Sequence, residues 1–565
     1  MKKFRILSLF LLSIILIPSC TDLGEEAFSV IPSDKYYTDK NSVNAAVLRP
    51  YEHGHWCAWD GDRWLLQELT GDHFVWTQKG KHGWDEGQWV RLHKHNWDYL
   101  QNQVYGSWTG PYQGIGYINN TLNDFNTMDL SNIITEQEKK AYIAELRVLR
   151  VWYYSFLIDF FRNIPISEDN LTIKEQSTPQ EVFDYMEKEL KDVMPELSKE
   201  PAIGRHGQAS AASILVRMYL NAKVWTGVDR SSDCITIARD IIGGKYGTYS
   251  IDNDYRGPFQ SFIDKRSPEN IFEWPHKRNV YELGWMYSAF HHYKSNSILD
   301  TDGWNGYNGI HLTPSRDLDG NIYNFVMGKP YEKFADVDYR KQNYEVINSA
   351  GNTKGFFLIG TQYEFDKEKG YGYDPLKPVT GSEEWTDKPL VFVDQVGRFS
   401  EKPNGRWGEG SHVTTGEENS GVRLMKFGPL SHSHSLFMSN SIAEIRLAEI
   451  YYSLAECLYK QGNKVEAAKL LDAVRKRNYP DSEWAKYSYE TNSSMLTDQE
   501  FIDEWGREFL GEHRRRTDLI RWGRFGDAWW DKDVDKTDKE YTIFPIPSKA
   551  LNANPLLKQT TRGWE

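Results

Sequence analysis

Apolar residues recur at every third or fourth position over long stretches of this chain, which is the period of a helix buried on one face. One such stripe consists of Tyr142, Leu146, Leu149, Tyr153, Phe156 and Phe160. Thr135, followed three residues later by Glu138, forms a capping box at which the helix begins, and Pro165 ends it. A second helix is predicted from Thr178, with Pro179 at its first helical position.

Further helices are predicted on both sides of the chain's middle. Residues 205–225 are rich in alanine, which lets a neighbouring helix approach closely. Residues 442–478 form a helical hairpin with Gly462 in its turn, and another helix begins at Thr497. Because small and large residues alternate across the hairpin, it resembles a tetratricopeptide (TPR) unit. We therefore predict a mainly α fold: a TPR-like scaffold of helical hairpins with long loops and a few short strands.

The helical pattern breaks between about residues 246 and 441, where Gly, Pro, Asn and Asp are frequent. Two short strands are predicted there, in NIFEW (270–274) and in GVRLMKFGPL (421–430). We expect an N-terminal part at 20–245 and a C-terminal part at 246–565, packed as one intertwined globular unit. Long loops in a compact protein are usually functional or disordered, and the aromatic residues here favour function.

The N-terminus has the layout of a secretory signal. Lys2, Lys3 and Arg5 precede an apolar run at 6–17, which is too short to cross a bilayer. Cys20 follows a small residue directly behind this run, as in a bacterial lipobox, and the next residues resemble the acidic export tag of Bacteroidetes surface lipoproteins. We predict a lipoprotein signal peptide at 1–19 and lipid on Cys20, with an ordinary secreted protein as the alternative.

Charge and composition narrow the class of ligand. The formal charge is −13, and losing the signal's three basic residues makes it −16, which argues against nucleic acid as a partner. After Cys20 only Cys57, Cys234 and Cys457 remain, so we expect buried thiols rather than a disulfide framework or a metal cluster. Aromatic residues make up 14% of the chain, and eight Trp lie between Tyr51 and Gly110.

Four segments, in order, resemble the SusD/RagB family of Bacteroidetes surface lipoproteins. They are AELRVLRVWYYSFLIDFFRNIPI (144–166), RHGQASAASILVRMYLNAKVW (205–225), EWGREFLGEHRRRTDLIRWGRF (504–525) and FPIPSKALNANPLLKQTTRGW (544–564). The chain departs from the family pattern at Asn163, Trp505 and His513, where Gly, Arg and Gly are common. Together with the lipobox, the four matches identify the chain as a member of this family.

The resemblance implies a helical TPR-like protein anchored at the outer face of the outer membrane. It also implies a partner, a SusC-like TonB-dependent barrel transporter, which the lipoprotein covers like a lid. Members of the family capture glycans, usually oligosaccharides, and deliver them without cutting them. No cofactor, metal or enzymatic activity is therefore expected.

The first candidate site lies within residues 68–97, which resemble a glycan-binding segment of the family. Trp84 corresponds there to a ligand-facing position. A flat indole can cover the apolar face of a sugar ring, while Asp72, Asp85 and Gln88 could bind its hydroxyl rim. Trp76 is a further ligand-binding candidate. Core positions are favoured for the remaining tryptophans considered, which are Trp64, Trp89, Trp97 and Trp108.

The second candidate site is the loop DGWNGYNG at 302–309. It places Trp304 and Tyr307 among glycines and asparagines, where an aromatic ring can serve as a platform. Asn305 and Asn308 carry both a donor and an acceptor, which suits sugar hydroxyls. The alternative is that these rings pack back onto the scaffold.

Two other groups of residues are assigned structural roles. His93, His95, His291 and His292 lack partners at the spacing of a metal site, so structural or surface histidines are favoured. The dense charges at 504–521 have the three- and four-residue spacing of a paired network.

Two other functions stay open at this point. A glycoside hydrolase would need two carboxylates at a set separation, and no motif pairs two. A binder of peptides or of another nutrient is the other alternative.

Overall fold

The computed structural model describes residues 33–281, 285–400 and 410–564. The predicted signal peptide at 1–19 and the lipid site Cys20 lie outside these residues. None of the helices in the described ranges combines the length and the apolar character needed to cross a bilayer.

Helix is the main secondary structure of the described chain, as predicted. The helices are α2 (Ser33–Tyr36), α3 (Lys40–His55), α4 (Asp62–Glu68), α5 (Gln88–His93), α6 (Asn102–Thr127), α7 (Glu136–Phe161), α8 (Pro179–Val193), α9 (Gln208–Thr226), α10 (Ser231–Ile242), α11 (Trp285–Phe290), α12 (Ser295–Leu299), α13 (Leu447–Lys460), α14 (Lys464–Arg475), α15 (Trp484–Tyr487), α16 (Asp498–Glu508), α17 (Arg515–Arg521) and α18 (Ser548–Ala553). The predicted caps are present: Thr135 with Glu138 at α7, Thr178 with Glu181 at α8, and Thr497 at α16.

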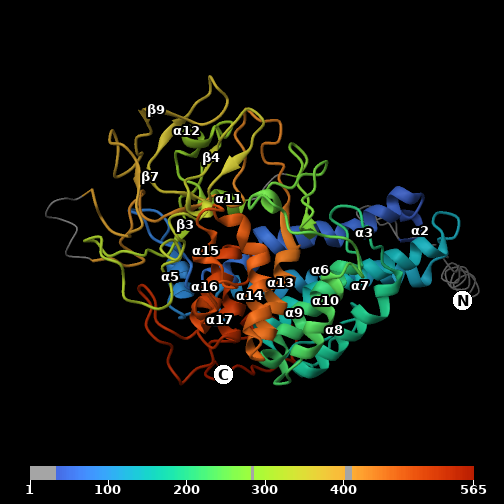
Figure 1. Ribbon diagram of the computed structural model, residues 1–565. Coiled ribbons are helices and arrows are strands. Elements are labelled where there is room, and N and C mark those ends of the chain that lie inside the picture. The colour runs from blue at the N-terminus through green and yellow to red at the C-terminus, as the bar shows by residue number, and fades with distance from the viewer. Residues whose placement is uncertain (1–32, 282–284, 401–409, 565) are drawn as a thin grey trace, which may run out of the picture.

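The long helices pack one on the next to form the scaffold. Contacts run from α6 through α7, α8, α9 and α10 to α13 and α14, so neighbouring helices form hairpins. Gly462, in the turn between α13 and α14, has a φ of +87°, a conformation that favours glycine. Figure 1 shows these helices filling the lower and right-hand parts of the molecule, with the short strands above and to the left.

The strands of the described ranges form six antiparallel pairs, each of two strands. The pairs are β1 (Phe74–Trp76) with β3 (Ile310–Leu312), β2 (Asn270–Trp274) with β12 (Ile442–Arg446), β4 (Glu345–Val346) with β5 (Thr353–Lys354), β6 (Phe357–Leu358) with β11 (Arg423–Leu424), β7 (Gly360–Thr361) with β10 (Val391–Phe392), and β8 (Tyr363–Phe365) with β9 (Tyr373–Pro378). Both predicted strands are present: β2 covers NIFEW, and β11 covers two residues of the second segment.

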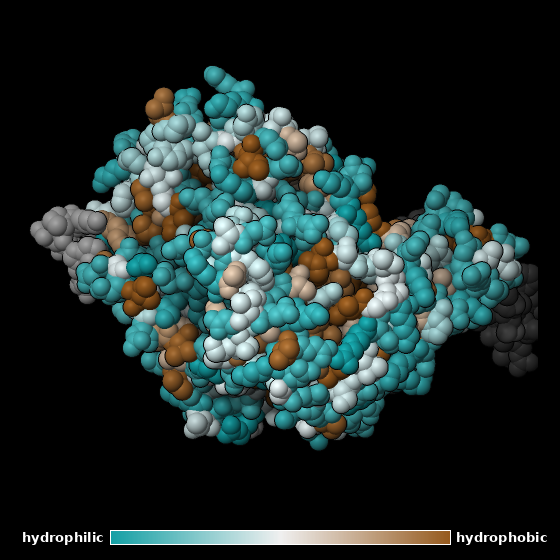
Figure 2. Space-filling model, viewed as in Figure 1, coloured by the Kyte–Doolittle hydropathy of each residue, from teal (hydrophilic) through white to brown (hydrophobic). Residues whose placement is uncertain are grey.

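One large apolar cluster occupies the helical body and reaches the strand pair β2–β12. It contains the tryptophans assigned to the core, namely Trp64, Trp89, Trp97 and Trp108, so that prediction is confirmed. A smaller cluster lies under the loops, around Tyr344, Leu390 and Phe392. Figure 2 shows a mostly hydrophilic surface from the same side, with apolar residues gathered over the loop region at upper left and in a band near the centre. The loops are therefore packed elements of the fold.

Candidate functional site

The strand pair β1–β3 brings the two predicted ligand-binding segments together. Phe74 is opposite Leu312, and Trp76 is opposite Ile310. Because the strands are antiparallel, the segment that follows β1 and the segment that precedes β3 leave the pair at the same end. Residues 77–87 and 300–309 therefore meet above one edge of the small sheet.

A cavity of about 440 Å³ lies between these two segments. Its walls are formed by Trp76, Thr77, Lys79, His82, Gly83, Asp85, Tyr293, Gly306, Tyr307 and Asn308. Aromatic rings and polar groups thus face the same space, which is the composition of a site for a small polar ligand with apolar faces. Four of the residues singled out from the sequence, Trp76, Asp85, Tyr307 and Asn308, line this one cavity.

Trp84 does not itself line the cavity, but it lies on a tight turn between two residues that do, Gly83 and Asp85. Its side chain is 50% exposed, as expected from the sequence. The backbone has positive φ values on both sides of Trp84: 76° at Gly83, 41° at Asp85, 57° at Glu86 and 74° at Gly87. Such strain in non-glycine residues persists only where surrounding contacts fix it.

Contacts on both sides of the turn hold it in place. Arg91 Nη1 donates a hydrogen bond to the carbonyl oxygen of Glu86 at 2.9 Å, and Trp89 Nε1 donates to Asp85 Oδ2 at 2.6 Å. A Cβ on Gly87 would lie 3.3 Å from the Trp84 ring, so the indole rests against the glycine backbone. The exposed indole is therefore held in a defined orientation before any ligand arrives.

Trp76 differs from the expectation of an exposed platform. Only 7% of its surface is exposed, and its indole stacks on Trp89 with ring centroids 4.3 Å apart and planes 9° apart. A Cβ added to Gly309 would lie 2.4 Å from the Trp76 ring. The backbone directly before β3 therefore covers much of the indole. Trp76 is a buried wall of the cavity, because its position in β1 turns it toward Trp89 and Gly309.

The loop before β3 divides its two aromatic residues. Tyr307 is 56% exposed and lines the cavity, and its backbone N–H donates to Ser288 O at 2.6 Å. Trp304 is half-buried, packs edge-on against His291 at 5.3 Å and does not line the cavity. Asn305 is exposed, but its Oδ1 accepts a hydrogen bond from the Asn296 backbone at 3.0 Å. The structure therefore brings Tyr307, but not Trp304, to the cavity wall.

Asp72 was expected at the ligand and is instead part of the interior. It is fully buried, and its oxygens accept from Arg515 Nε at 2.7 Å and from the Gly328 backbone N–H at 2.7 Å. Burial would raise the pKa of Asp72, but Arg515 and His73 outweigh burial and hold it well below its usual range. This buried ion pair removes Asp72 from the site, and the expectation of ligand contact is wrong.

Two other polar candidates have protein partners. The Asn308 side chain lines the cavity, but it accepts from Arg423 Nη2 at 2.6 Å and donates to Glu418 O at 2.9 Å. Gln88 accepts from Gln103 Nε2 at 2.9 Å. Both side chains are held by the scaffold, so they support the walls of the site.

Four lining residues were not singled out from the sequence: Thr77, Lys79, His82 and Tyr293. Lys79 lies in QKGKHG, which has the composition of an exposed turn. Its burial depends on β3, which is distant in sequence, so no local pattern signals it. Only the glycines at 80 and 83 indicated a turn at this position.

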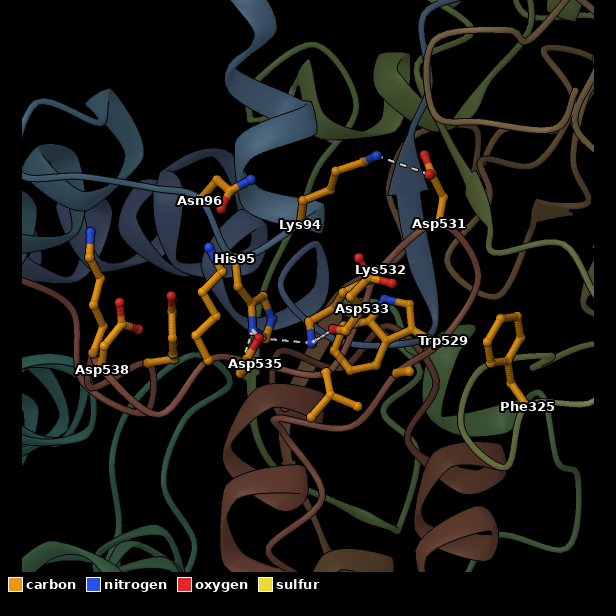
Figure 3. Close-up of a pocket in the computed structure, with 15 residues that line it drawn as sticks. Lys94, His95, Asn96, Phe325, Trp529, Asp531, Lys532, Asp533, Asp535 and Asp538 are labelled. Atoms are coloured by element: carbon orange, nitrogen blue, oxygen red, sulfur yellow. Dashed lines mark hydrogen bonds and ion pairs between the residues drawn. The ribbon is translucent and has the colours of Figure 1, made fainter. Parts of the chain in front are cut away.

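A larger cavity of about 620 Å³ lies beneath α5 and contains none of the predicted ligand residues. Figure 3 shows its charged lining, in which Lys94 meets Asp531, and Asp535 meets both His95 and Lys532. Trp529 on its wall is fully buried. These three ion pairs compensate one another's charges, and the covered indole of Trp529 presents no free face to a sugar ring.

The histidines and the C-terminal charges have the structural roles expected for them. His93 and His292 are buried, and burial lowers the pKa of each to about 4. His93 Nε2 bonds Trp530 O at 2.8 Å, and His292 lies 3.3 Å from Glu418. The charged residues of α16 and α17 form buried ion pairs, including Arg507–Glu504 and Arg521–Glu456, both at 2.7 Å. The prediction of a paired network is confirmed.

Comparison with known proteins finds matches to two family models and to characterised relatives. Residues 268–564 match the model of the SusD family, and residues 61–220 match a model described as starch-binding and associating with the outer membrane. The starch-binding protein SusD of Bacteroides thetaiotaomicron is 24% identical over 468 residues, covering 79% of this chain and 77% of that protein.

Solved structures of low sequence identity share the fold. Surface glycan-binding protein A from Bacteroides thetaiotaomicron has a TM-score of 0.63 at 20% identity, covering 93% of this chain and 99% of that one. The same protein in complex with laminarihexaose has a TM-score of 0.59 at 20% identity, covering 92% and 99%. The mainly helical scaffold with long loops and short strands is therefore confirmed as the fold of this chain.

Proposed function

Because this chain belongs to the SusD family, we propose that it is a glycan-binding lipoprotein of the outer membrane that captures oligosaccharides without cleaving them. The bound glycan is passed to a SusC-like TonB-dependent transporter. The lipid on Cys20 anchors the protein at the cell surface. The relatives are named for binding starch or surface glycans, which supports the same role for this chain.

One observation carries the proposal: exposed Trp84 and Tyr307 flank a cavity at which two distant segments meet. A pyranose ring has apolar C–H faces and a polar rim. Flat rings can cover the faces, while Asp85 and the backbone of the two loops can bind the rim. The strained turn at 83–87 fixes the indole in advance, so little side-chain entropy is lost when a sugar binds.

The lining of the cavity favours binding over hydrolysis. Glycosidases need two carboxyl groups at a set separation across the scissile bond. Among the described residues that line the cavity, Asp85 is the one carboxylate. A binding site needs no second acid.

The test is isothermal titration of purified protein against a panel of neutral and acidic oligosaccharides. Trp84→Ala should weaken binding of whichever glycan binds by roughly ten- to a hundredfold, since a large apolar contact stabilises by about 1.5–3 kcal/mol. The matched control is Trp56→Ala, because Trp56 is 40% exposed and lies against Gly110 of α6, outside the cavity lining. Equal loss in both variants, or none in Trp84→Ala, contradicts the proposed site.

Two further measurements separate the alternative functions. Prolonged incubation of a bound glycan with the protein should release no reducing ends; their release would indicate a hydrolase. Failure on every glycan with success on a peptide mixture would replace the proposal with peptide binding. For the anchor, Cys20→Ala should move the protein from the outer-membrane fraction into the soluble fraction.

A further inference from the structure

Lys79 is a buried cation at the wall of the proposed glycan site. Its side chain follows β1, is 2% exposed and lines the cavity. The Nζ atom donates to the carbonyl oxygen of Gly309 at 2.8 Å, while the Lys79 backbone N–H donates to His82 O at 2.9 Å. The ammonium group thus lies where the two loops of the site meet.

No carboxylate pairs with this cation in the described ranges. Among the described residues, each lysine–carboxylate pair within 4.0 Å involves a lysine other than Lys79. Glu384 lies beyond this distance from Lys79, although its charge still raises the pKa of Lys79. Burial lowers the pKa of Lys79 well below its usual value, Arg423 lowers it further, and Glu384 opposes both. An ammonium has three N–H donors, and one of them has an acceptor here. Buried lysines are rare without an anionic partner, because the desolvation of the charge is uncompensated.

Trp76 supplies a second unsatisfied donor on the same cavity. Its Nε1 is buried and has no hydrogen-bond acceptor among the described residues. A buried N–H without an acceptor costs about 1–3 kcal/mol. Trp76 and Lys79, which both line the cavity, therefore each carry a donor that the described residues do not fully satisfy.

We infer that this cavity takes a sugar unit that carries an anionic group, either the carboxylate of a uronic acid or a sulfate ester. The inference rests on the proposed function and narrows its class of ligand. An anion has acceptors and no donors, so it can accept from Lys79 Nζ and balance its charge, whereas a neutral hydroxyl compensates no charge. Trp84 and Tyr307 then cover the faces of the same sugar or of its neighbour. Asp85, the carboxylate that lines the cavity, accepts a hydrogen bond from Trp89 Nε1 at 2.6 Å.

The experiment compares matched ligands on the intact protein. Oligouronides are titrated alongside the same oligosaccharides after carboxyl reduction, which keeps the backbone and removes the charge. Sulfated and unsulfated forms of one neutral oligosaccharide make the second pair. We expect the acidic member of one pair to bind at least about tenfold more tightly, since hydrogen bonds to a charged group contribute about 1.5–3 kcal/mol.

Substitutions in the cavity wall then test which residues cause the preference for the acidic ligand. Lys79→Met keeps the length of the side chain and removes the charge, and it should abolish the preference for the acidic ligand. Lys81→Met is the matched control, because Lys81 is an exposed lysine of the same loop that pairs with Glu383 at 3.2 Å. Trp76→Phe keeps an aromatic ring and removes the N–H, so it should reduce the preference in part. Thermal melting confirms that each variant is folded.

The outcomes separate the inference from the proposed function. Tighter binding of uronides assigns a carboxylate, and tighter binding of the sulfated form assigns a sulfate ester. Equal binding within both pairs, or a preference unchanged in Lys79→Met, overturns the inference while the glycan-binding function stands. If Lys79→Met does not fold, the ligand pairs on the intact protein still decide. Absence of binding to every glycan overturns the proposed function itself.

Discussion

Arg446 and Lys79 are both buried cations, but their surroundings differ. Arg446, at the end of β12, donates to Glu269 at 2.8 Å, to Glu508 at 2.7 Å and to Glu512 at 2.7 Å. Lys79, after β1, donates to a single backbone carbonyl. Carboxylates of the protein therefore compensate Arg446, whereas none of the described carboxylates lies within ion-pair distance of Lys79.

The largest effect should come from breaking the network of the helical body. Glu508 contacts Arg446, Arg340 and Arg477 within 3.1 Å. Glu508→Ala leaves these guanidinium groups without one of their anions, and we expect a loss of about 3–5 kcal/mol in the free energy of unfolding. Urea denaturation measures it. An unchanged midpoint would show that this network does not stabilise the body.

Acid should weaken the same network. Burial would raise the pKa of Glu504, but Arg507 and Arg475 outweigh burial and lower it to about 2. A carboxyl whose folded pKa lies below its unfolded value stabilises the fold above the unfolded pKa, and this stabilisation is lost as the pH falls. The free energy of unfolding should therefore fall by up to about 3 kcal/mol between roughly pH 5 and pH 2 because of this residue.

Glu504→Gln isolates this contribution, because other titrating groups affect both proteins alike. Denaturation curves at a series of pH values should show a shallower decline for the variant than for the unchanged chain. Parallel curves for the two proteins would contradict the assignment to Glu504.

The loop region should respond to a smaller change. Gly309→Ala places a Cβ where the Trp76 ring now lies 2.4 Å away, so the indole must move against the cavity. We expect a loss of about 1–3 kcal/mol in stability from overpacking and a weaker affinity for the glycan. Gly116→Ala is the control, because the nearest atom to a Cβ there is 3.7 Å away. Calorimetric titration and denaturation follow both variants, and full affinity in Gly309→Ala would show that the indole's position does not matter for binding.

The smallest effect should come from an exposed ion pair on α8. Lys188 Nζ lies 2.5 Å from Asp192, and both side chains are largely in solvent. Water and salt screen such pairs. Asp192→Ala should leave the midpoint of thermal unfolding unchanged within error. A clear shift would show that surface charges contribute to this scaffold after all.

Local features made much of the fold predictable. The capping boxes at Thr135 and Thr178 and the apolar periodicity after them lie within single helices, so the sequence predicts α7 and α8 at the correct positions. The exposure of Trp84 was likewise predictable, because glycines on both sides of it indicate a turn. These features depend on neighbours within a few residues.

The rest of the site depends on partners far away in the sequence. Asp72 is buried by Arg515, which is 443 residues distant, and Trp76 is covered by Gly309 once β1 pairs with β3. Lys79 lies in a segment with the composition of an exposed turn. No periodicity or turn signal records these contacts, so the sequence predicted the exposure of Trp84 but not the burial of Asp72, Trp76 and Lys79.

The pairing of β1 with β3 also makes ligand capture a late event in the life of the chain. Lys79 donates a hydrogen bond to Gly309, which is 230 residues away, and both Lys79 and Tyr307 line the same cavity. A nascent or proteolytically cut chain that ends before residue 300 contains Trp84 but lacks the opposing loop. Sugar retention on a glycan column therefore reports that both halves of the polypeptide have folded together.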